Sequence, residues 1–195
     1  HNNGGFSTEE EAKGNPYTNG RIETCCTIAW MAMSVEMLKM SGNPLVADEL
    51  ELSTLNSVVG MHSITGRWAT YNTPSNGVRC AHTQDITFQS RQGSPELNCC
   101  SVNAPRGLGM ISDWALMKDQ QGLVLNWYGP SQLHARLKRT DIKIEQSTDY
   151  PKAGKITIKV KPARATAFSL KLRIPQWSRR TSVLVNGEKV SGVSA

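Results

Sequence analysis

The segment GLVLNWY, residues 122–128, marks the point at which the hydrophobic pattern of the chain changes its period. Upstream of this segment, apolar residues recur every three or four positions, which is typical of helices. Downstream, apolar and polar residues alternate, as in KITIKVK (155–161) and FSLKLRI (168–174), which is the pattern of half-buried antiparallel strands. The change of period predicts an α+β protein with two parts, a helical part over residues 1–120 and a β part over residues 121–195.

Three helices are predicted in the first part. The segment at 24–40 is apolar around most of its circumference, so a helix there needs cover on more than one side. Further helices are predicted at 45–61 and at about 104–118, where Pro105 suits the first turn of a helix. Residues 62–98 show little periodicity, and long loops of this kind are usually functional or disordered. Such helices are typical of a piece of a larger helical barrel.

Several short strands with turn signals between them predict a β-sandwich in the second part of the chain. The pair Asn186-Gly187 favours a two-residue hairpin turn of type I′. The sequence has 195 residues and no run that approaches the ~20 apolar residues of a membrane span. We therefore expect a soluble protein, located in the cytoplasm or, in bacteria, in the periplasm or outside the cell. The sequence also lacks an initial Met, so we expect a processed product or a fragment.

The charge is distributed unevenly along the chain. Residues 1–120 carry 8 basic and 12 acidic residues, a net charge of −4, whereas residues 121–195 carry 14 basic and 4 acidic residues, a net charge of +10. A basic half of this kind is one feature of nucleic-acid-binding proteins. Here the basic residues alternate with apolar ones, which is typical of the solvated face of a sheet, so we expect no nucleic-acid partner.

Four of the five cysteines occur as adjacent pairs, at 25–26 and 99–100. Adjacent cysteines rarely form a disulfide because the ring is strained, and a disulfide scaffold would space its cysteines more evenly. Glu23, Cys25, Cys99 and Cys100 together offer one carboxylate and three thiols, a donor set that suits Zn²⁺. The alternative is that these are buried free cysteines, which are common in protein cores. Cys26 and Cys80 fit no ligand pattern and are expected to be structural.

Four segments resemble glycoside hydrolase family 127 and its relatives, which include β-L-arabinofuranosidases. They are ETC (23–25), CCSVNAPRGLG (99–109), LVLNWYGPSQL (123–133) and LKLRIPQWSRRTSVLVNGE (170–188). The resemblance implies that the chain is the C-terminal portion of an (α/α)6 barrel followed by the start of an antiparallel β-sandwich. It also implies a retaining glycosidase that acts on β-L-arabinofuranosides or related plant-polymer sugars.

The same resemblance implies the roles of individual residues. Zinc would be held by Glu23, Cys25, Cys99 and Cys100, and Cys99 would be the nucleophile that forms a thioether glycosyl–enzyme intermediate. A glutamate would be the general acid and base, for which Glu11 matches best and Glu10 second. The acidic run at 9–11 has a plainer alternative, a solvated loop.

Further residues are candidates for contacts with a sugar. Trp68 and Tyr71 could stack on a sugar face, although packing in a core explains them equally well. His82 precedes the second cysteine pair and could also lie near the sugar, whereas His62 and His134 are expected in loops or at the surface. Arg106 could anchor a carboxylate or orient the site.

Two other functions remain open at this point. The chain could be a non-catalytic module with a structural zinc site and a sheet that binds carbohydrate or protein. It could also be a fragment with half an active site, which would be inactive unless it assembles with a second copy or with the missing N-terminal part of its parent chain.

Overall fold

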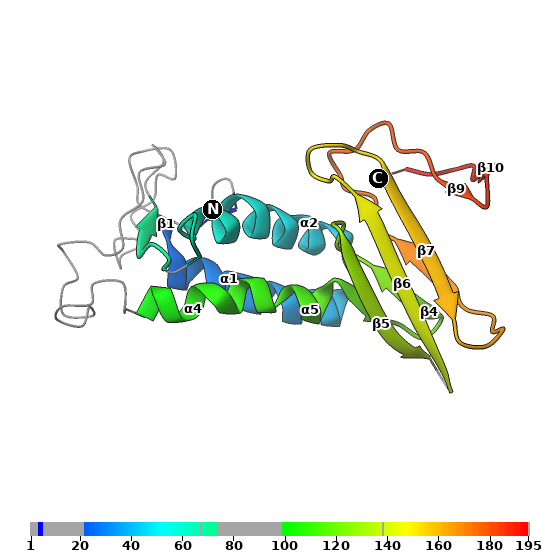
Figure 1. The fold of residues 1–195 in the computed structure, drawn as a ribbon, viewed down its shortest axis with the longest axis horizontal. Helices are drawn as coiled ribbons and strands as arrows, with labels where there is room; N and C mark the ends of the chain where they lie inside the picture. Colours follow the sequence, from blue (N-terminus) through cyan, green and yellow to red (C-terminus); the bar gives the residue numbers. More distant parts are fainter. Residues whose placement is uncertain (1–3, 6–21, 67, 74–98, 138, 195) are drawn as a thin grey trace. The chain divides into compact units, whose positions relative to one another are not determined.

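The computed structural model describes residues 4–5, 22–66, 68–73, 99–137 and 139–194, which form two compact units, residues 1–111 and 112–195 (Figure 1). The first unit contains the helices α1 to α4, and the second is built mostly from strands. The structure is thus a mixed α and β protein. Within the described residues, no helix combines the length and the apolar character needed to cross a membrane.

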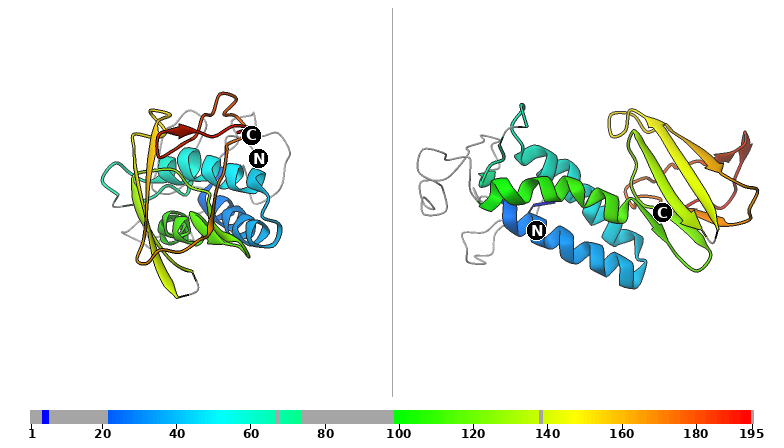
Figure 2. Two further views of the ribbon diagram at one scale, coloured as in Figure 1. Left: turned by 90° about the vertical axis from the view of Figure 1, so that its right-hand side faces the viewer. Right: turned by 60° about the horizontal axis from the view of Figure 1, so that its bottom comes forward.

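The helical unit is built around α1 (Thr24–Ser41), which packs against α2 (Pro44–Leu52) and α4 (Cys99–Gly109) (Figures 1 and 2). Helix α1 ends at Gly42, whose left-handed backbone lets its N–H donate to the Leu38 carbonyl at 2.9 Å. Helix α2 then begins at once, because the Asn43 side chain accepts a hydrogen bond from the Leu45 N–H at 3.0 Å.

The helix predicted at 45–61 is present but is not uniform. Helix α2 continues into a π-helical turn, η1 (Ser53–Val58), and then into α3 (Val59–Met61). A π-helical turn occurs as a short insertion within an α-helix, whereas the sequence predicted one continuous helix over 45–61.

The helix predicted at 104–118 was wrong at both ends. Helix α4 (Cys99–Gly109) contains Pro105 in its interior, α5 (Ile111–Trp114) follows, and β3 (Leu116–Lys118) is already a strand. A proline within a helix removes one backbone hydrogen bond. The burial of Cys100, Ala104 and Gly107 along one face of α4 stabilises the helix against the loss of that one hydrogen bond.

A short antiparallel pair fixes the start of α1. Strand β1 (Ile22–Glu23) pairs with β2 (Asn72–Thr73), with Glu23 opposite Asn72. Immediately afterwards, the Thr24 N–H donates to the Tyr71 carbonyl at 3.0 Å, and the Thr24 hydroxyl donates to the Thr70 carbonyl at 2.7 Å. Residues 22–25 and 70–73 are therefore held as one local structure.

The second unit contains two three-stranded sheets and a terminal hairpin. One sheet has the order β3, β4 (Gly122–Leu125), β8 (Ser169–Leu172), and the other has the order β5 (Ser131–Leu137), β6 (Thr140–Thr148), β7 (Ile156–Pro162). The hairpin joins β9 (Leu184–Val185) to β10 (Glu188–Lys189). Asn186 and Gly187 between them have φ values of 53° and 91°, as a type I′ turn requires.

Among the described strands of the second unit, the predicted antiparallel pairing is confirmed except between β4 and β8. Strands β4 and β8 are parallel, with Gly122 opposite Ser169. The pairing brings the backbones so close that a Cβ atom on Gly122 would lie 2.1 Å from the Ser169 carbonyl oxygen. Alternation of apolar residues reports which face of a strand is buried and carries no information on strand direction.

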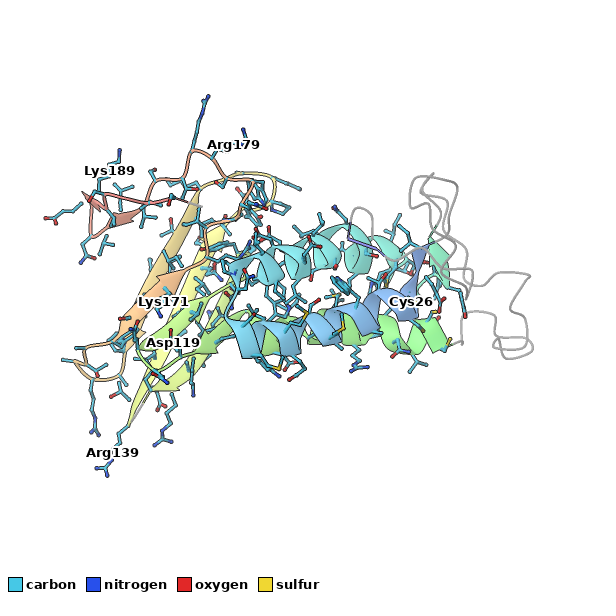
Figure 3. The ribbon with its side chains drawn as sticks, turned by 180° about the vertical axis from the view of Figure 1, so that it is seen from behind. Cys26, Asp119, Arg139, Lys171, Arg179 and Lys189 are labelled. Atoms are coloured by element: carbon cyan, nitrogen blue, oxygen red, sulfur yellow. The ribbon has the colours of Figure 1, made fainter. Side chains whose placement is uncertain are left out.

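The inner faces of the two sheets share one apolar core. Leu123 of β4 and Ile142 and Ile144 of β6 are fully buried, and apolar side chains from both sheets pack around them. Asp119 and Lys171 lie side by side (Figure 3), and the Lys171 Nζ is 2.5 Å from an Asp119 carboxylate oxygen. Asp119 also accepts from the Gln121 and Gly122 N–H groups at 2.8 Å each, which closes the turn between β3 and β4.

Candidate active site

Three thiols from two distant parts of the chain converge in the helical unit. The sulfur atoms of Cys25, Cys99 and Cys100 all lie within 4.8 Å of one another, and we call this group the thiol cluster. The Cys25 and Cys100 sulfurs, 75 residues apart in sequence, are separated by 3.1 Å, and the Cys99 and Cys100 sulfurs by 3.9 Å. The structure gives all three cysteines as thiols and not as members of a disulfide.

Secondary structure places the three sulfurs together. Cys25 lies in the first turn of α1, which the β1–β2 pair and the Thr24 hydrogen bonds hold in place. Cys99 and Cys100 lie in the first turn of α4, which packs along α1. The Ser101 hydroxyl donates to the Ala69 carbonyl at 3.3 Å and so fixes this turn to residues 68–73.

The three cysteines differ in exposure. Cys100 is fully buried, Cys25 is partly buried, and Cys99 is exposed. Cys99 is thus the member of the cluster that a molecule in solution can reach most easily, while the Cys100 sulfur faces the protein interior.

Neighbouring groups distribute the charge within the cluster unequally. The pKa of Cys25 is lowered from 9.0 to about 6, mainly because the Cys100 thiol donates a hydrogen bond to it, with further hydrogen bonds from Asn103 and Cys99. The pKa of Cys100 is raised, because it is the donor in that bond and because it is desolvated. Burial and the proximity of Cys25 also raise the pKa of Cys99. In the metal-free cluster, Cys25 is therefore the most acidic of the three thiols, and Cys99 ionises less readily than an ordinary cysteine.

Tyr71 lies against the cluster and is buried, with only 2% of its surface exposed. Its pKa is raised, first by desolvation and then by the nearby acidic groups Glu23, Cys99 and Cys100. A hydrogen bond between Tyr71 and Cys99 raises the pKa of the tyrosine and lowers that of the cysteine. Tyr71 therefore stays protonated and can donate to the Cys99 sulfur.

The donor set fits a soft divalent cation. Three thiolates at about 2.3 Å from a tetrahedral Zn²⁺ would lie about 3.8 Å from one another. The Cys99–Cys100 distance of 3.9 Å already matches this spacing, and the Cys25–Cys100 distance of 3.1 Å would have to widen. A bound cation would remove the shared proton that holds the latter pair together, so this widening is expected.

Glu23, the predicted carboxylate ligand, lies two residues before Cys25 and is 7% exposed. Among the described residues, the group of ligand atoms within 4.8 Å of one another consists of the three sulfurs and does not include the Glu23 carboxylate. Glu23 nevertheless lies close enough for its charge to raise the pKa values of Cys25 and Tyr71.

The other predicted site residues are distributed as follows. Trp68 is partly buried, and its carbonyl accepts from the Ser63 N–H at 2.9 Å. Cys26 is on α1 (Figure 3) and is not a member of the thiol cluster. Glu10, Glu11, Cys80 and His82 lie outside the described residues.

The histidines and Arg106 lie as follows. The His62 ring Nδ1 lies 2.7 Å from the Val58 carbonyl oxygen, His134 is exposed on β5, and Arg106 is exposed on α4.

Sequence reasoning assigned no role to Asn103, which contacts the thiol cluster directly. Its side-chain amide donates to the Cys25 sulfur at 3.4 Å and to the Cys99 carbonyl at 3.2 Å. The available signal was the spacing of four residues from Cys99, one helical turn. That signal was hidden because the helix was expected to begin near residue 104, after Asn103.

Sequence profiles of two domains match the chain. The catalytic domain of the GH127 β-L-arabinofuranosidases matches residues 3–113, and the GH127 middle domain matches residues 122–195. The first match contains the whole thiol cluster. No curated protein matches the chain in sequence.

Solved structures of similar fold include members of the same family. A GH127 β-L-arabinofuranosidase from Geobacillus stearothermophilus T6 is 25% identical with a TM-score of 0.79, over 98% of this chain and 32% of that one. A protein described as a glycoside hydrolase is 29% identical with a TM-score of 0.72, over 90% of this chain and 29% of that one. The GH127 β-arabinofuranosidase BT3674 shares the fold at 23% identity with a TM-score of 0.76, over 99% of this chain and 33% of that one.

The chain thus spans about a third of the length of each of these structures. The catalytic-domain match alone covers more than half of the chain, and the similarity of fold extends over nearly all of it. The chain belongs to glycoside hydrolase family 127, the family of the β-L-arabinofuranosidases.

Proposed function

We propose that this chain carries the nucleophilic half of the active centre of a retaining glycosidase that cleaves β-L-arabinofuranosides or related plant-polymer sugars. Residues 1–120 would form the last part of an (α/α)6 barrel and residues 121–195 the start of a β-sandwich. The observation that carries the proposal is the convergence of three thiols within the region that matches the GH127 catalytic domain.

Glu23, Cys25, Cys99 and Cys100 would hold a zinc ion in this proposal. The zinc would supply the positive charge that keeps the ligating sulfurs deprotonated near neutral pH. Such a charge is needed because burial and the neighbouring Cys25 raise the pKa of Cys99 in the metal-free cluster. Three thiolates and a carboxylate are also the soft, mixed donor set that suits zinc.

Cys99 is the proposed nucleophile because it is the exposed member of the thiol cluster. Its thiolate attacks the anomeric carbon, the carbon–oxygen bond to the leaving group breaks, and a glutamic acid protonates the departing oxygen. Water then attacks the same carbon, the glutamate takes a proton from that water, and the carbon–sulfur bond breaks to release the Cys99 thiolate. Two displacements at one carbon retain the configuration.

The proposed acid and base is Glu11, with Glu10 as the second candidate, and both lie outside the described residues. Tyr71 is proposed to position Cys99, because its buried hydroxyl stays protonated and forms a hydrogen bond with that cysteine. Trp68, Tyr71 and His82 stay predictions for contacts with the sugar. Candidate partners beyond the carbohydrate are the rest of the catalytic domain or a second copy of the chain.

The proposal is tested by labelling with an arabinofuranosyl probe that carries an electrophile near its anomeric carbon. The zinc-loaded chain is incubated with the probe, and the modified cysteine is identified by mass spectrometry. We expect the label on Cys99, with Cys99→Ala abolishing it and Cys26→Ala leaving it unchanged. A label on Cys25, or equal labelling of all thiols, would contradict the assignment of the nucleophile.

The same chain should hydrolyse aryl arabinofuranosides slowly or not at all by itself, because it spans about a third of its structural relatives. Addition of the remaining catalytic domain, or self-association, would then restore turnover. A chain that binds zinc but never modifies Cys99, even in the assembled protein, would favour the non-catalytic module with a structural zinc site.

A further inference from the structure

Asn103 connects the two segments that form the thiol cluster. It lies on α4, one turn after Cys99, and its side chain reaches the sulfur of Cys25 on α1. The two residues joined by this contact are 78 positions apart in sequence. The contact is therefore a tertiary one, made between the two arms that would have to close on a metal.

The chemistry of the two acceptors fixes the orientation of the amide. The Cys99 carbonyl oxygen can only accept, so the group that faces it at 3.2 Å must be the Asn103 NH₂. The amide nitrogen carries two hydrogens. The second is available for the Cys25 sulfur at 3.4 Å, an ordinary distance for a donor to sulfur. Both hydrogens of this nitrogen are thus used within the site.

We infer that Asn103 is a positioning residue that holds Cys25 and the first turn of α4 in the geometry that a metal ion requires. The inference rests on the proposed function, because it concerns the metal that the cluster would bind. An N–H donated to a ligating thiolate orients the sulfur and withdraws part of its electron density. Loss of a residue that hydrogen-bonds to a metal ligand commonly lowers metal affinity by about 10- to 100-fold.

The inference is tested with Co²⁺ as a spectroscopic probe. Thiolate sulfur bound to Co²⁺ gives a charge-transfer band in the near ultraviolet, and the band moves to longer wavelength when the sulfur loses a hydrogen bond. Titration of the full 195-residue chain with Co²⁺ therefore reports affinity and ligand electron density together.

Asn103→Leu keeps a similar volume and removes both donors, and we expect it to weaken Co²⁺ binding about 10- to 100-fold. The band should also shift to longer wavelength, which a merely structural defect would not cause. Asn103→Ser keeps one donor on a shorter side chain, so its Co²⁺ affinity and band position should lie between those of the wild type and Asn103→Leu. If Asn103→Leu does not fold, Asn103→Ser takes its place in the test. Val102→Ala is the matched control, because Val102 is on the same turn and is 75% exposed.

An Asn103→Leu protein with the affinity and the spectrum of the wild type would overturn the inference. A wild-type chain that gives no thiolate band with Co²⁺ would overturn the proposed metal site, and the inference with it. The two failures are distinguishable. In the first, the wild type and Asn103→Leu both give the thiolate charge-transfer band at the same position. In the second, the wild type gives no such band. Unfolding in the presence of a chelator checks that the metal-free variants are folded.

Discussion

Gly107 is buried where α4 packs against Ile28 of α1 and Val58 of η1, and its replacement tests how the thiol cluster is positioned. A Cβ atom added there would lie 2.5 Å from Cδ1 of Ile28 on α1 and 2.9 and 3.0 Å from the two γ-carbons of Val58. Carbon atoms in contact normally lie about 3.5–4.0 Å apart. Helix α4 would therefore have to retreat from α1 and η1 by several tenths of an ångström or more.

The expected cost of Gly107→Ala follows from two opposing effects. Overpacking of a filled core usually costs about 1–3 kcal/mol. Ile28 can swing the end of its side chain aside, but Val58 is branched next to the backbone and fully buried, so the cost is concentrated there. Against this, alanine is better than glycine within a helix by about 1 kcal/mol. The net loss in the free energy of unfolding should be about 0–2 kcal/mol.

Gly109→Ala is the matched control, because it makes the same change in the same helix where an added Cβ meets nothing within 4 Å. It should gain the same ~1 kcal/mol of helix propensity without the steric cost, so it should stabilise the protein. Urea unfolding of the chelated proteins measures both, and the two variants should differ by about 1–3 kcal/mol. Gly107→Ala should also bind Co²⁺ more weakly, because Cys99 and Cys100 move with α4.

A second substitution makes the test stricter. Val58→Ala removes both γ-carbons that the new Cβ would meet, so in the double variant Gly107→Ala should cost less than it does alone. Equal stability of the two glycine variants, or additive effects of Gly107→Ala and Val58→Ala, would refute the steric account of how α4 is placed.

Three further outcomes are expected. In the chelated protein, alkylation of Cys25 should follow a midpoint near its pKa of about 6, and a midpoint near 9 would contradict the hydrogen bonding from Cys100. Cys99→Ser should lower the zinc content, by elemental analysis, from near one per chain to substoichiometric, and an unchanged content would exclude Cys99 as a ligand. Lys171 and two backbone N–H groups lower the pKa of Asp119 in the folded protein. The ionised Asp119 therefore stabilises the fold above the ordinary pKa of 3.8, and this stabilisation is lost as the pH falls through the lower pKa of the folded state. Asp119→Asn should therefore destabilise the protein at pH 7, less so at high salt, and urea unfolding at two salt concentrations checks this.

Residue types and periodicity predicted much of the fold. The apolar pattern around Ile28 and Leu38 predicted α1, and the alternation around Ile142 and Ile158 predicted the sheets. The π-helical turn η1 and the start of α4 were not predicted, because both depend on tertiary packing. Proline is common in the first turn of a helix, so Pro105 suggested that the helix begins near residue 104. The burial of Cys100 and Gly107 explains why α4 instead begins at Cys99 and continues past Pro105.

The composition of the candidate site was more predictable than its geometry. Adjacent cysteines rarely form a disulfide with each other, which led to the prediction that Cys25, Cys99 and Cys100 contribute to one metal site. The structure brings their three sulfurs together. The sequence contained no sign of which thiol would be the most acidic, because that depends on hydrogen bonds across 75 residues. Asn103 was missed for the same reason, since its contact with Cys25 exists only in the folded chain.

The proposed function requires that the thiol cluster and Glu23 hold a zinc ion at which Cys99 acts. X-ray absorption at the zinc edge of the purified chain tests this claim most directly, because it counts the ligand atoms and measures their distances. We predict three sulfurs at about 2.3 Å and one oxygen at about 2.0–2.2 Å, with one sulfur fewer in Cys99→Ser. A spectrum with only oxygen or nitrogen ligands, or a wild-type spectrum with fewer than three sulfurs, would contradict the account.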